Sequence, residues 1–164
     1  MRLTTRTNLA MRTLMVCAVN QGRTVRKHEI ATASEASENH LAQVINALGQ
    51  HGYVKTTRGR NGGLRLACAP SEISVGEVFR RFEGVVPFAD CFDPDSQGCP
   101  LLPGCRLRQA LSAAVDAFYA SLDGHTLADM VTGGDGFDHL LDFSRPITPL
   151  GTPCTRGSSR IAAV

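Results

Sequence analysis

The sequence predicts a protein that is mainly α-helical with one small β-hairpin, and three observations predict this class. Apolar residues recur at helical spacing in three long stretches, at about 8–20, 38–50 and 105–122. A short β-prone stretch at 53–66 is interrupted by a glycine-rich turn. Little else in the chain reads as strand, so we expect helices to form most of the core.

The composition is that of a globular domain. Apolar residues make up 43% of the 164 residues, which is ample for a packed core. No apolar run reaches the length that spans a membrane, and the start of the chain lacks the apolar stretch of a signal peptide. We therefore expect a cytoplasmic protein.

The first helix is expected from about Asn8 to Asn20, with Thr7 as its N-cap. Its buried stripe stands at i, i+3, i+4 and i+7 and consists of Met11, Leu14, Met15 and Ala18. The Gln-Gly-Arg sequence at 21–23 then ends the helix.

Two further helices joined by a tight turn follow the first. We expect a short helix at about 26–34, a turn at 35–36, and a second helix at 38–50 that Ser37 caps. The buried stripe of the second helix again has helical spacing and consists of Leu41, Val44, Ile45 and Leu48. This arrangement is a helix-turn-helix.

A hairpin follows the helix-turn-helix. Residues 53–57 have the β-branched and aromatic character of a strand, 58–63 form a glycine-rich turn, and 64–66 return as the partner strand. Leu64 and Leu66 share one face of that strand, with Arg65 on the other. A helix-turn-helix with such a hairpin is a winged helix, and residues 1–83 are assigned to this domain.

The charge distribution favours a nucleic-acid partner for this domain. Residues 1–66 carry a net charge of +7, whereas the remainder carries −5. A basic front suits the phosphate backbone, and Asn, Gln and His side chains can read base edges. The predicted contacts with double-stranded DNA are Ser37, Glu38, Asn39, His40 and Gln43 from the second helix and Arg58, Arg60, Asn61, Gly62 and Arg65 from the hairpin. The alternative is a hairpin that only covers the core, with solvated arginines.

The second half of the chain suggests a dimer. A helix is expected from Ile73 to Phe82, then a loop at 84–105, then the longest helix from about Cys105 to Leu122. That helix has an apolar seam over four turns, made of Leu107, Ala110, Leu111, Ala114, Val115, Phe118 and Leu122. A second copy is the simplest cover for the seam, so residues 106–131 are assigned to dimerisation. The Gly-, Pro- and Ser-rich residues 132–164 predict a disordered tail.

Three of the six cysteines lie close together in the sequence. Cys91, Cys99 and Cys105 fall on the 84–105 loop, whereas Cys17 and Cys68 suit small apolar sites and Cys154 lies in the tail. Three thiolates from one loop suit an iron–sulfur cluster with one iron held by another ligand. Zinc, thiol redox switching and chance clustering are the alternatives, and Cys-x2-Cys pairs typical of zinc are absent from this sequence.

An enzyme is not expected. Cysteine catalysis needs an orienting histidine, and none of the five histidines is near 91–105 in the sequence. The glycines at 59–63 lie between strands and lack the Gly-Lys-Ser/Thr ending of a phosphate-binding loop.

The motifs at 37–48, 52–54 and 58–66, with the start Met-Arg-Leu-Thr and the three-cysteine loop, resemble the Rrf-type winged-helix regulators over about residues 1–131. The resemblance implies a homodimeric transcription regulator. It also implies that a cluster on Cys91, Cys99 and Cys105, [4Fe–4S] or alternatively [2Fe–2S], controls operator binding.

Two subgroups of that family are similar to different parts of the chain. The sequences at 105–111 and 122–129 look like the NsrR type, repressors of nitric-oxide detoxification genes. The seven-residue gap between Cys91 and Cys99, together with Asn8, looks like the iron-responsive RirA type. The IscR type is less similar, because Arg108 stands where that type has a ligating histidine.

Two residues depart from the family pattern. Asn8 stands where some NsrR-like proteins have an Asp that is thought to complete the cluster of the partner subunit. Asn8 of the partner subunit, water or a small thiol would then hold the fourth iron, or Asn8 only begins the first helix. Glu35 stands in the turn where relatives often have Gly.

Overall fold

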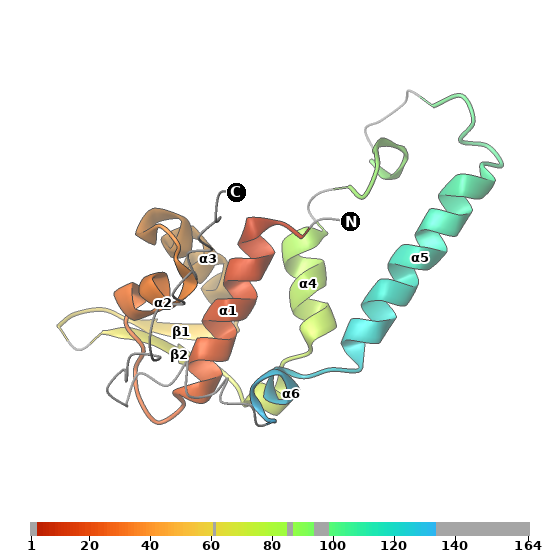
Figure 1. The fold of residues 1–164 in the computed structure, drawn as a ribbon. Helices are drawn as coiled ribbons and strands as arrows, with labels where there is room; N and C mark the ends of the chain where they lie inside the picture. Colours follow the sequence, from red (N-terminus) through yellow and green to blue (C-terminus); the bar gives the residue numbers. More distant parts are fainter. Residues whose placement is uncertain (1–2, 61, 85–86, 94–98, 134–164) are drawn as a thin grey trace, which may run out of the picture.

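The computed structural model describes residues 3–60, 62–84, 87–93 and 99–133. The elements along the chain are α1 (Thr5–Val19), α2 (Lys27–Ser34), α3 (Glu38–Gln50), β1 (Val54–Thr57), β2 (Gly63–Leu66), η1 (Pro70–Glu72), α4 (Val75–Glu83), η2 (Asp90–Phe92), α5 (Arg106–Asp123) and α6 (Leu127–Val131). Helices α1 to α4 and the hairpin form a core domain, and α5 runs along α4 with its N-terminal end beyond that core (Figure 1). The predicted class, mainly α with a small hairpin, is confirmed.

Helix α1 begins earlier than the sequence predicts. Thr4, rather than Thr7, is the N-cap, and its Oγ1 accepts a hydrogen bond from Thr7 N at 3.2 Å. Thr4 is itself held by Glu83, whose Oε1 accepts bonds from Thr4 N at 2.7 Å and Thr4 Oγ1 at 3.0 Å. Because Thr7 is fully buried inside the helix, the predicted start at Asn8 is wrong.

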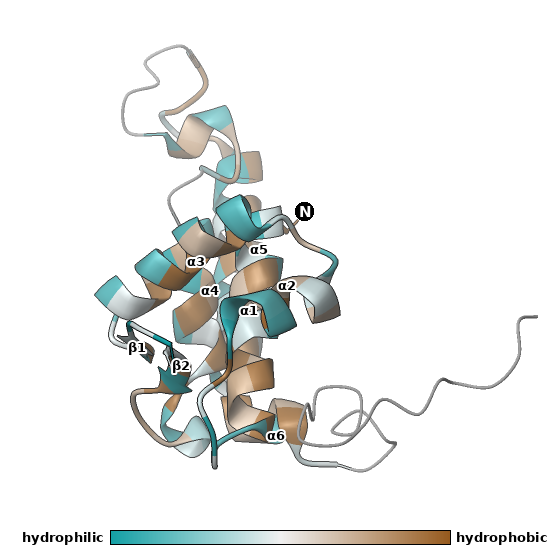
Figure 2. Ribbon diagram, turned by 90° about the vertical axis from the view of Figure 1, so that its left-hand side faces the viewer, coloured by the Kyte–Doolittle hydropathy of each residue, from teal (hydrophilic) through white to brown (hydrophobic). Residues whose placement is uncertain are grey.

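The helix-turn-helix has the predicted bounds to within one residue, and Ser37 caps α3 through a bond from His40 N. The stripe predicted for α3 is buried, and in Figure 2 the apolar stretches of this helix face the inside of the core. Glu35 closes α2 in the left-handed conformation, with φ 50° and ψ 36°. This conformation is the physical reason why Gly suits the position.

Glu35→Gly should therefore stabilise the domain by up to about 1 kcal/mol, because a side chain in the left-handed region costs roughly 1–2 kcal/mol and the extra freedom of unfolded Gly offsets part of this. Ala36→Gly is the matched control and should lower stability, since Ala36 has no positive φ. Urea unfolding of both variants tests this. Equal destabilisation by the two substitutions would contradict the strain at Glu35.

The hairpin is antiparallel, with Val54 paired to Leu66 and Thr57 to Gly63. Leu64 is buried as predicted, and its backbone also pairs with Val25 from the segment before α2. A Cβ at Gly63 would collide with the Val25 carbonyl, so a glycine lets the two backbones meet here. The wing is thereby attached to the helix-turn-helix by a third strand-like segment.

Helix α4 begins at Val75 with Ser74 as N-cap, two residues later than predicted, because Ile73 pairs instead with the start of α6. Leu127 N donates to the Ile73 carbonyl at 2.8 Å, and the Leu127 side chain is fully buried in the core. The sequence prediction does not include α6. This short helix anchors the C-terminal end of α5 to the core domain.

An ion pair also joins α4 to α5. The Arg80 guanidinium donates two hydrogen bonds to the Asp123 carboxylate, at 2.5 and 2.6 Å, and these hold the pKa of Asp123 below its usual value. A Cβ at Gly76 would collide with Asp123, so a glycine admits the end of α5 against α4. The predicted tail lies outside the described residues from 134 onward. Within the described part, no helix is long and apolar enough to cross a membrane.

Candidate DNA interface and cysteine loop

Helix α3 presents a polar outer side. Asn39 and Gln43, one turn apart, are exposed, and His40 is half-buried. Asn46 and Gln50 continue the same exposed stripe, which has spacing i, i+4, i+7 and i+11. The sequence analysis missed Asn46 and Gln50, although their helical spacing from Asn39 was a readable signal.

Ser37 and Glu38 have structural roles in addition to the predicted one. Ser37 is the N-cap of α3, and Glu38 Oε2 forms an ion pair with Lys27 Nζ at 2.8 Å. The hydrogen bond from Lys27 and its charge lower the pKa of Glu38. Glu38 thus links α2 to α3, and Asn39 and Gln43 are the more available side chains for base edges.

The wing carries its cations on an exposed surface. Arg58 and Arg60 are exposed, and Lys55 and Arg65 lie directly opposite each other on the two strands. Like charges in such a pair repel each other, which a phosphate between them would relieve. Arg65 Nε also donates to Thr24 Oγ1 at 2.7 Å, so this side chain steadies the wing.

The turn of the wing depends on backbone rather than side chains. Gly62 N donates to the Gly59 carbonyl at 2.9 Å, and a Cβ at Gly62 would collide with the Thr57 carbonyl. Gly62 is therefore required for the shape of the turn. Asn61, also predicted to contact DNA, lies outside the described residues.

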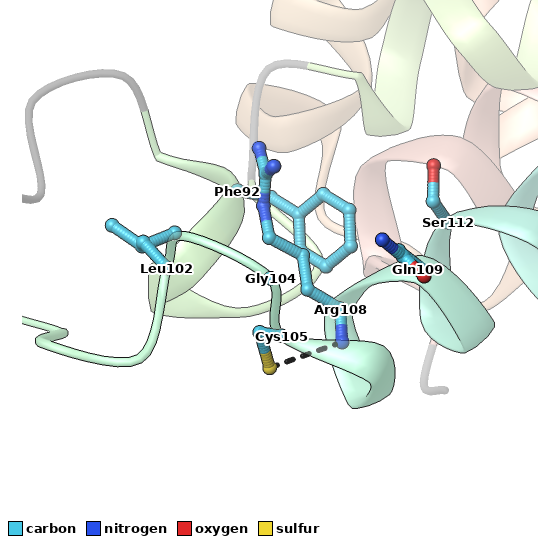
Figure 3. A pocket seen from close by; sticks show the side chains of 7 residues that line it. All are labelled: Phe92, Leu102, Gly104, Cys105, Arg108, Gln109 and Ser112. Atoms are coloured by element: carbon cyan, nitrogen blue, oxygen red, sulfur yellow. Dashed lines mark hydrogen bonds between the residues drawn. The ribbon is translucent and has the colours of Figure 1, made fainter.

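The three loop cysteines are half-buried free thiols at the far end of α5. Cys91 lies in η2, Cys99 follows the undescribed residues 94–98, and Cys105 is the N-cap of α5. Cys105 Sγ accepts a hydrogen bond from Arg108 N at 3.4 Å (Figure 3). The prediction that the long helix begins at Cys105 is thus off by one residue.

Arg108 connects two of these cysteines. Its Nε donates to the Cys91 carbonyl at 3.0 Å, and its guanidinium carbon lies 5.4 Å from the centroid of the Phe92 ring. The side chain borders a hollow of about 260 Å³ at the start of α5, lined by Phe92, Leu102, Gly104, Cys105, Arg108, Gln109 and Ser112. Figure 3 shows Arg108 stacked over Phe92, above the Cys105 thiol.

The thiols fit an iron–sulfur cluster by donor chemistry, since three unpaired cysteines on one segment are the ligands such a group prefers. Among the described residues, however, no three His, Cys, Asp or Glu side chains are gathered closely enough to hold a metal ion. Asn8 is exposed on α1, and no described contact joins it to the cysteine loop. The thiols of Cys91, Cys99 and Cys105 would have to lie closer together to share one bound group.

Cys17 and Cys68 differ from the loop cysteines. Cys17 is only 2% exposed in the core, and its burial raises the pKa of its thiol to about 12. Cys68 packs against the core, and its burial, aided by the charge of Glu72, also raises the pKa of its thiol. The expectation that both fill small apolar sites agrees with this packing.

Native Cys17 should resist alkylation at pH 8. A pKa of about 12 in place of 9.0 leaves about 10³-fold less thiolate, and burial also blocks access. Iodoacetamide labelling of the apo protein, read by peptide mass spectrometry, should modify Cys91, Cys99 and Cys105 first and Cys17 only after unfolding. Labelling of native Cys17 as fast as Cys91 would contradict the buried thiol.

Helix α5 has no buried residue, despite its apolar seam. Leu111, Val115, Phe118 and Leu122 are half-buried, and the Phe118 ring lies 6.2 Å from that of Phe79 on α4. Helix α4 therefore covers part of the predicted seam. The rest of the seam is an exposed strip, defined here as Leu107, Ala110 and Ala114, in which Leu107 is 67% exposed.

Known proteins of one family match this chain. The family model described as Rrf2, iron-dependent transcriptional regulator, matches residues 3–133. The regulator NsrR of Geobacillus kaustophilus is 42% identical over 132 residues, covering 80% of this chain and 90% of that protein. Protein aau3 of Rhizobium meliloti is 40% identical over 149 residues, covering 91% and 97%. NsrR of Bacillus subtilis is 39% identical over 142 residues, covering 86% and 97%.

Solved structures agree with this match. IscR of T. potens superposes with a TM-score of 0.65 at 25% identity, covering 85% of this chain and 96% of that one. CymR, the global cysteine regulator of B. subtilis, has a TM-score of 0.64 at 25% identity, covering 82% and 99%. The matching family and the NsrR and CymR relatives are regulators rather than enzymes, and the predicted resemblance to Rrf-type and NsrR-type proteins is confirmed. The chain therefore belongs to the Rrf2 family of transcriptional regulators.

Proposed function

We propose that this regulator is a homodimeric repressor whose operator binding is controlled by an iron–sulfur cluster that senses nitric oxide. The observation that carries the proposal is that Cys105, one of the three loop cysteines, is itself the N-cap of α5. A change in the ligation or oxidation state of these thiols would therefore act directly on the start of α5, the helix that carries the exposed apolar strip. The similarity to NsrR regulators supports nitric oxide as the signal.

For DNA binding, α3 enters the major groove and the wing contacts the backbone. Asn39, Gln43 and Asn46 are exposed on one stripe and suit base edges, whereas Arg58 and Arg60 suit phosphates. Residues 1–83 are thus the DNA-binding domain. Residues 106–131 form the dimerisation segment, so that two copies of α3 meet successive grooves of a two-fold operator.

Cys91, Cys99 and Cys105 would hold the cluster, which we propose to be [4Fe–4S]. When bound, it supplies accessible iron that a diatomic ligand such as nitric oxide attacks. Asn8 of the partner subunit, water or a small thiol would complete the set of ligands. A neutral amide is a weak ligand for iron, which favours an exchangeable position there.

The protein's part in the mechanism is to link the ligation of the three cysteines to the position of the segment that precedes α5. With all three thiols ligated, Cys91 and Cys99 would be tied to Cys105 at the start of α5, and this would restrain how the two copies of α5 pack. Without ligation that restraint would be absent, and the recognition helices would lose their fixed spacing. Helix α6 and the Arg80–Asp123 pair then carry the change from α5 to the DNA-binding core.

Replacing Arg58 and Arg60 together with Ala should weaken binding to all DNA sequences alike. Each arginine that contacts a phosphate contributes about one unit to the slope of log affinity against log salt. The double variant should therefore lose about two units of slope in fluorescence anisotropy titrations. Lys55→Ala is a comparison on the strand rather than the tip. An unchanged slope would mean that the tip of the wing does not contact phosphates.

Iron availability is the second candidate signal, because the matching family model is described as iron-dependent. An anaerobic titration of operator DNA separates the two signals. A nitric-oxide sensor loses DNA binding within seconds of nitric oxide at constant iron, whereas an iron sensor loses it only when a chelator removes the metal. A colourless protein that carries zinc, or one that responds to thiol oxidants alone, would instead support a zinc- or thiol-based regulator.

A further inference from the structure

We propose that Arg108 is a positioning residue that clamps the two ends of the cysteine loop together before any cluster is bound. The proposal rests on the function proposed above for Cys91, Cys99 and Cys105. It adds a residue that is not a ligand and that prepares the ligands for their task.

The first argument is the set of contacts that Arg108 makes. Its backbone N donates to Cys105 Sγ at 3.4 Å, while its side-chain Nε donates to the Cys91 carbonyl at 3.0 Å. These partners are far apart in sequence, since Cys91 precedes Arg108 by 17 residues. Residue 108 therefore contacts both the first and the third cysteine of the loop, and the arginine side chain supplies the contact with Cys91.

The second argument is the stacking of the guanidinium on Phe92. The guanidinium carbon lies 5.4 Å from the ring centroid, within the range of a cation–π contact. Phe92 also ends the short helix η2, in which Phe92 N donates to the Ala89 carbonyl at 2.8 Å. The stacking on Phe92 and the hydrogen bond to Cys91 together hold η2 against the first turn of α5.

The third argument is charge. A guanidinium remains positive at every physiological pH, and the loop must gather thiolates that repel one another. The guanidinium places a fixed cation beside the Cys91 backbone, and it supplies no competing ligand, because Arg has donors and no acceptor. A shorter or neutral side chain at 108 would lose the planar donor geometry, the charge, or both.

Two substitutions of Arg108 test the clamp. Arg108→Gln removes the positive charge, and Arg108→Lys keeps the charge without the planar guanidinium group. Arg106→Gln is the matched control. Arg106 is exposed on the same turn and has no described contact with the loop. Hydrogen exchange of the apo protein reads the clamp directly, at the Phe92 and Asp93 amides that close η2. We expect exchange there to be roughly tenfold faster in Arg108→Gln, with Arg106→Gln like the wild type.

The second measurement follows the loss of visible absorption when a chelator is added to anaerobically reconstituted protein. Removing a residue that orients metal ligands typically weakens metal binding by roughly 10- to 100-fold, so bleaching should be faster in Arg108→Gln, with Arg108→Lys in between. Wild-type exchange in Arg108→Gln would overturn the clamp, whatever the cofactor. A wild-type protein that binds no cluster, combined with faster exchange in Arg108→Gln, would support the clamp and overturn only the cofactor assignment.

Discussion

Cys99→Ser should abolish the regulated operator binding of this protein. The substitution removes one of three thiolates, and a serine hydroxyl is a poor replacement for a soft thiolate ligand. The affinity should fall to that for non-specific DNA, a loss of about 10³-fold or more, measured by anaerobic fluorescence anisotropy at fixed salt. Cys99 is only half-buried, so the helical circular dichroism should remain that of the wild type.

Cys68→Ser is the matched control for this loss. Cys68 lies between the wing and η1, outside the loop, and serine there should leave the colour and the affinity of the protein close to wild type. Cys91→Ser and Cys105→Ser should behave like Cys99→Ser. If Cys99→Ser keeps a DNA affinity that depends on the cluster, the assignment of these three ligands is wrong.

Ala114→Asp should separate the proposed dimer. Ala114 is exposed in the protomer, in the strip with Leu107 and Ala110, so the charge costs little until a second copy covers it. An unpaired charge in a covered interface costs about 3–5 kcal/mol, which weakens the dimer by at least roughly 100-fold. Sedimentation velocity measures this change. Operator affinity should fall with it, because each half-site is then bound alone.

Ala120→Asp is the control for this substitution. It places the same charge on α5, but on a side of the helix that is rotated from Ala114 by about 120° around the helix axis. Ala120 is also exposed in the protomer. It should leave the dimer intact. A dimer that survives Ala114→Asp and Leu107→Asp alike would rule out this strip as the interface.

The helix-turn-helix was predictable because its signals are local. The cap at Ser37, the stripe of α3 and the glycine-rich turn of the hairpin all act within a few residues. The start of α1 was not, because Thr4 is held by Glu83, which is 79 residues away in sequence. Helix α6 was missed for a similar reason, since a backbone bond to Ile73 stabilises its start.

The candidate site was predictable in composition and less so in arrangement. The spacing of the cysteines indicated a shared role, but it could not show that Arg108 joins Cys91 to Cys105. Charge counting likewise marked the wing as basic without showing that Arg65 is bonded to Thr24. Contacts between residues distant in sequence depend on packing, and packing leaves no local pattern to read.

The most direct test of cluster-controlled DNA binding is an anaerobic visible spectrum taken on the same sample as an operator titration, before and after nitric oxide. We expect a brown protein that binds the operator, and a spectrum that bleaches or shifts as binding is lost. A colourless protein from an anaerobic, iron-replete preparation that binds the operator with full affinity would contradict the account. The protein would then be a winged-helix regulator whose three loop cysteines bind zinc or act as thiols.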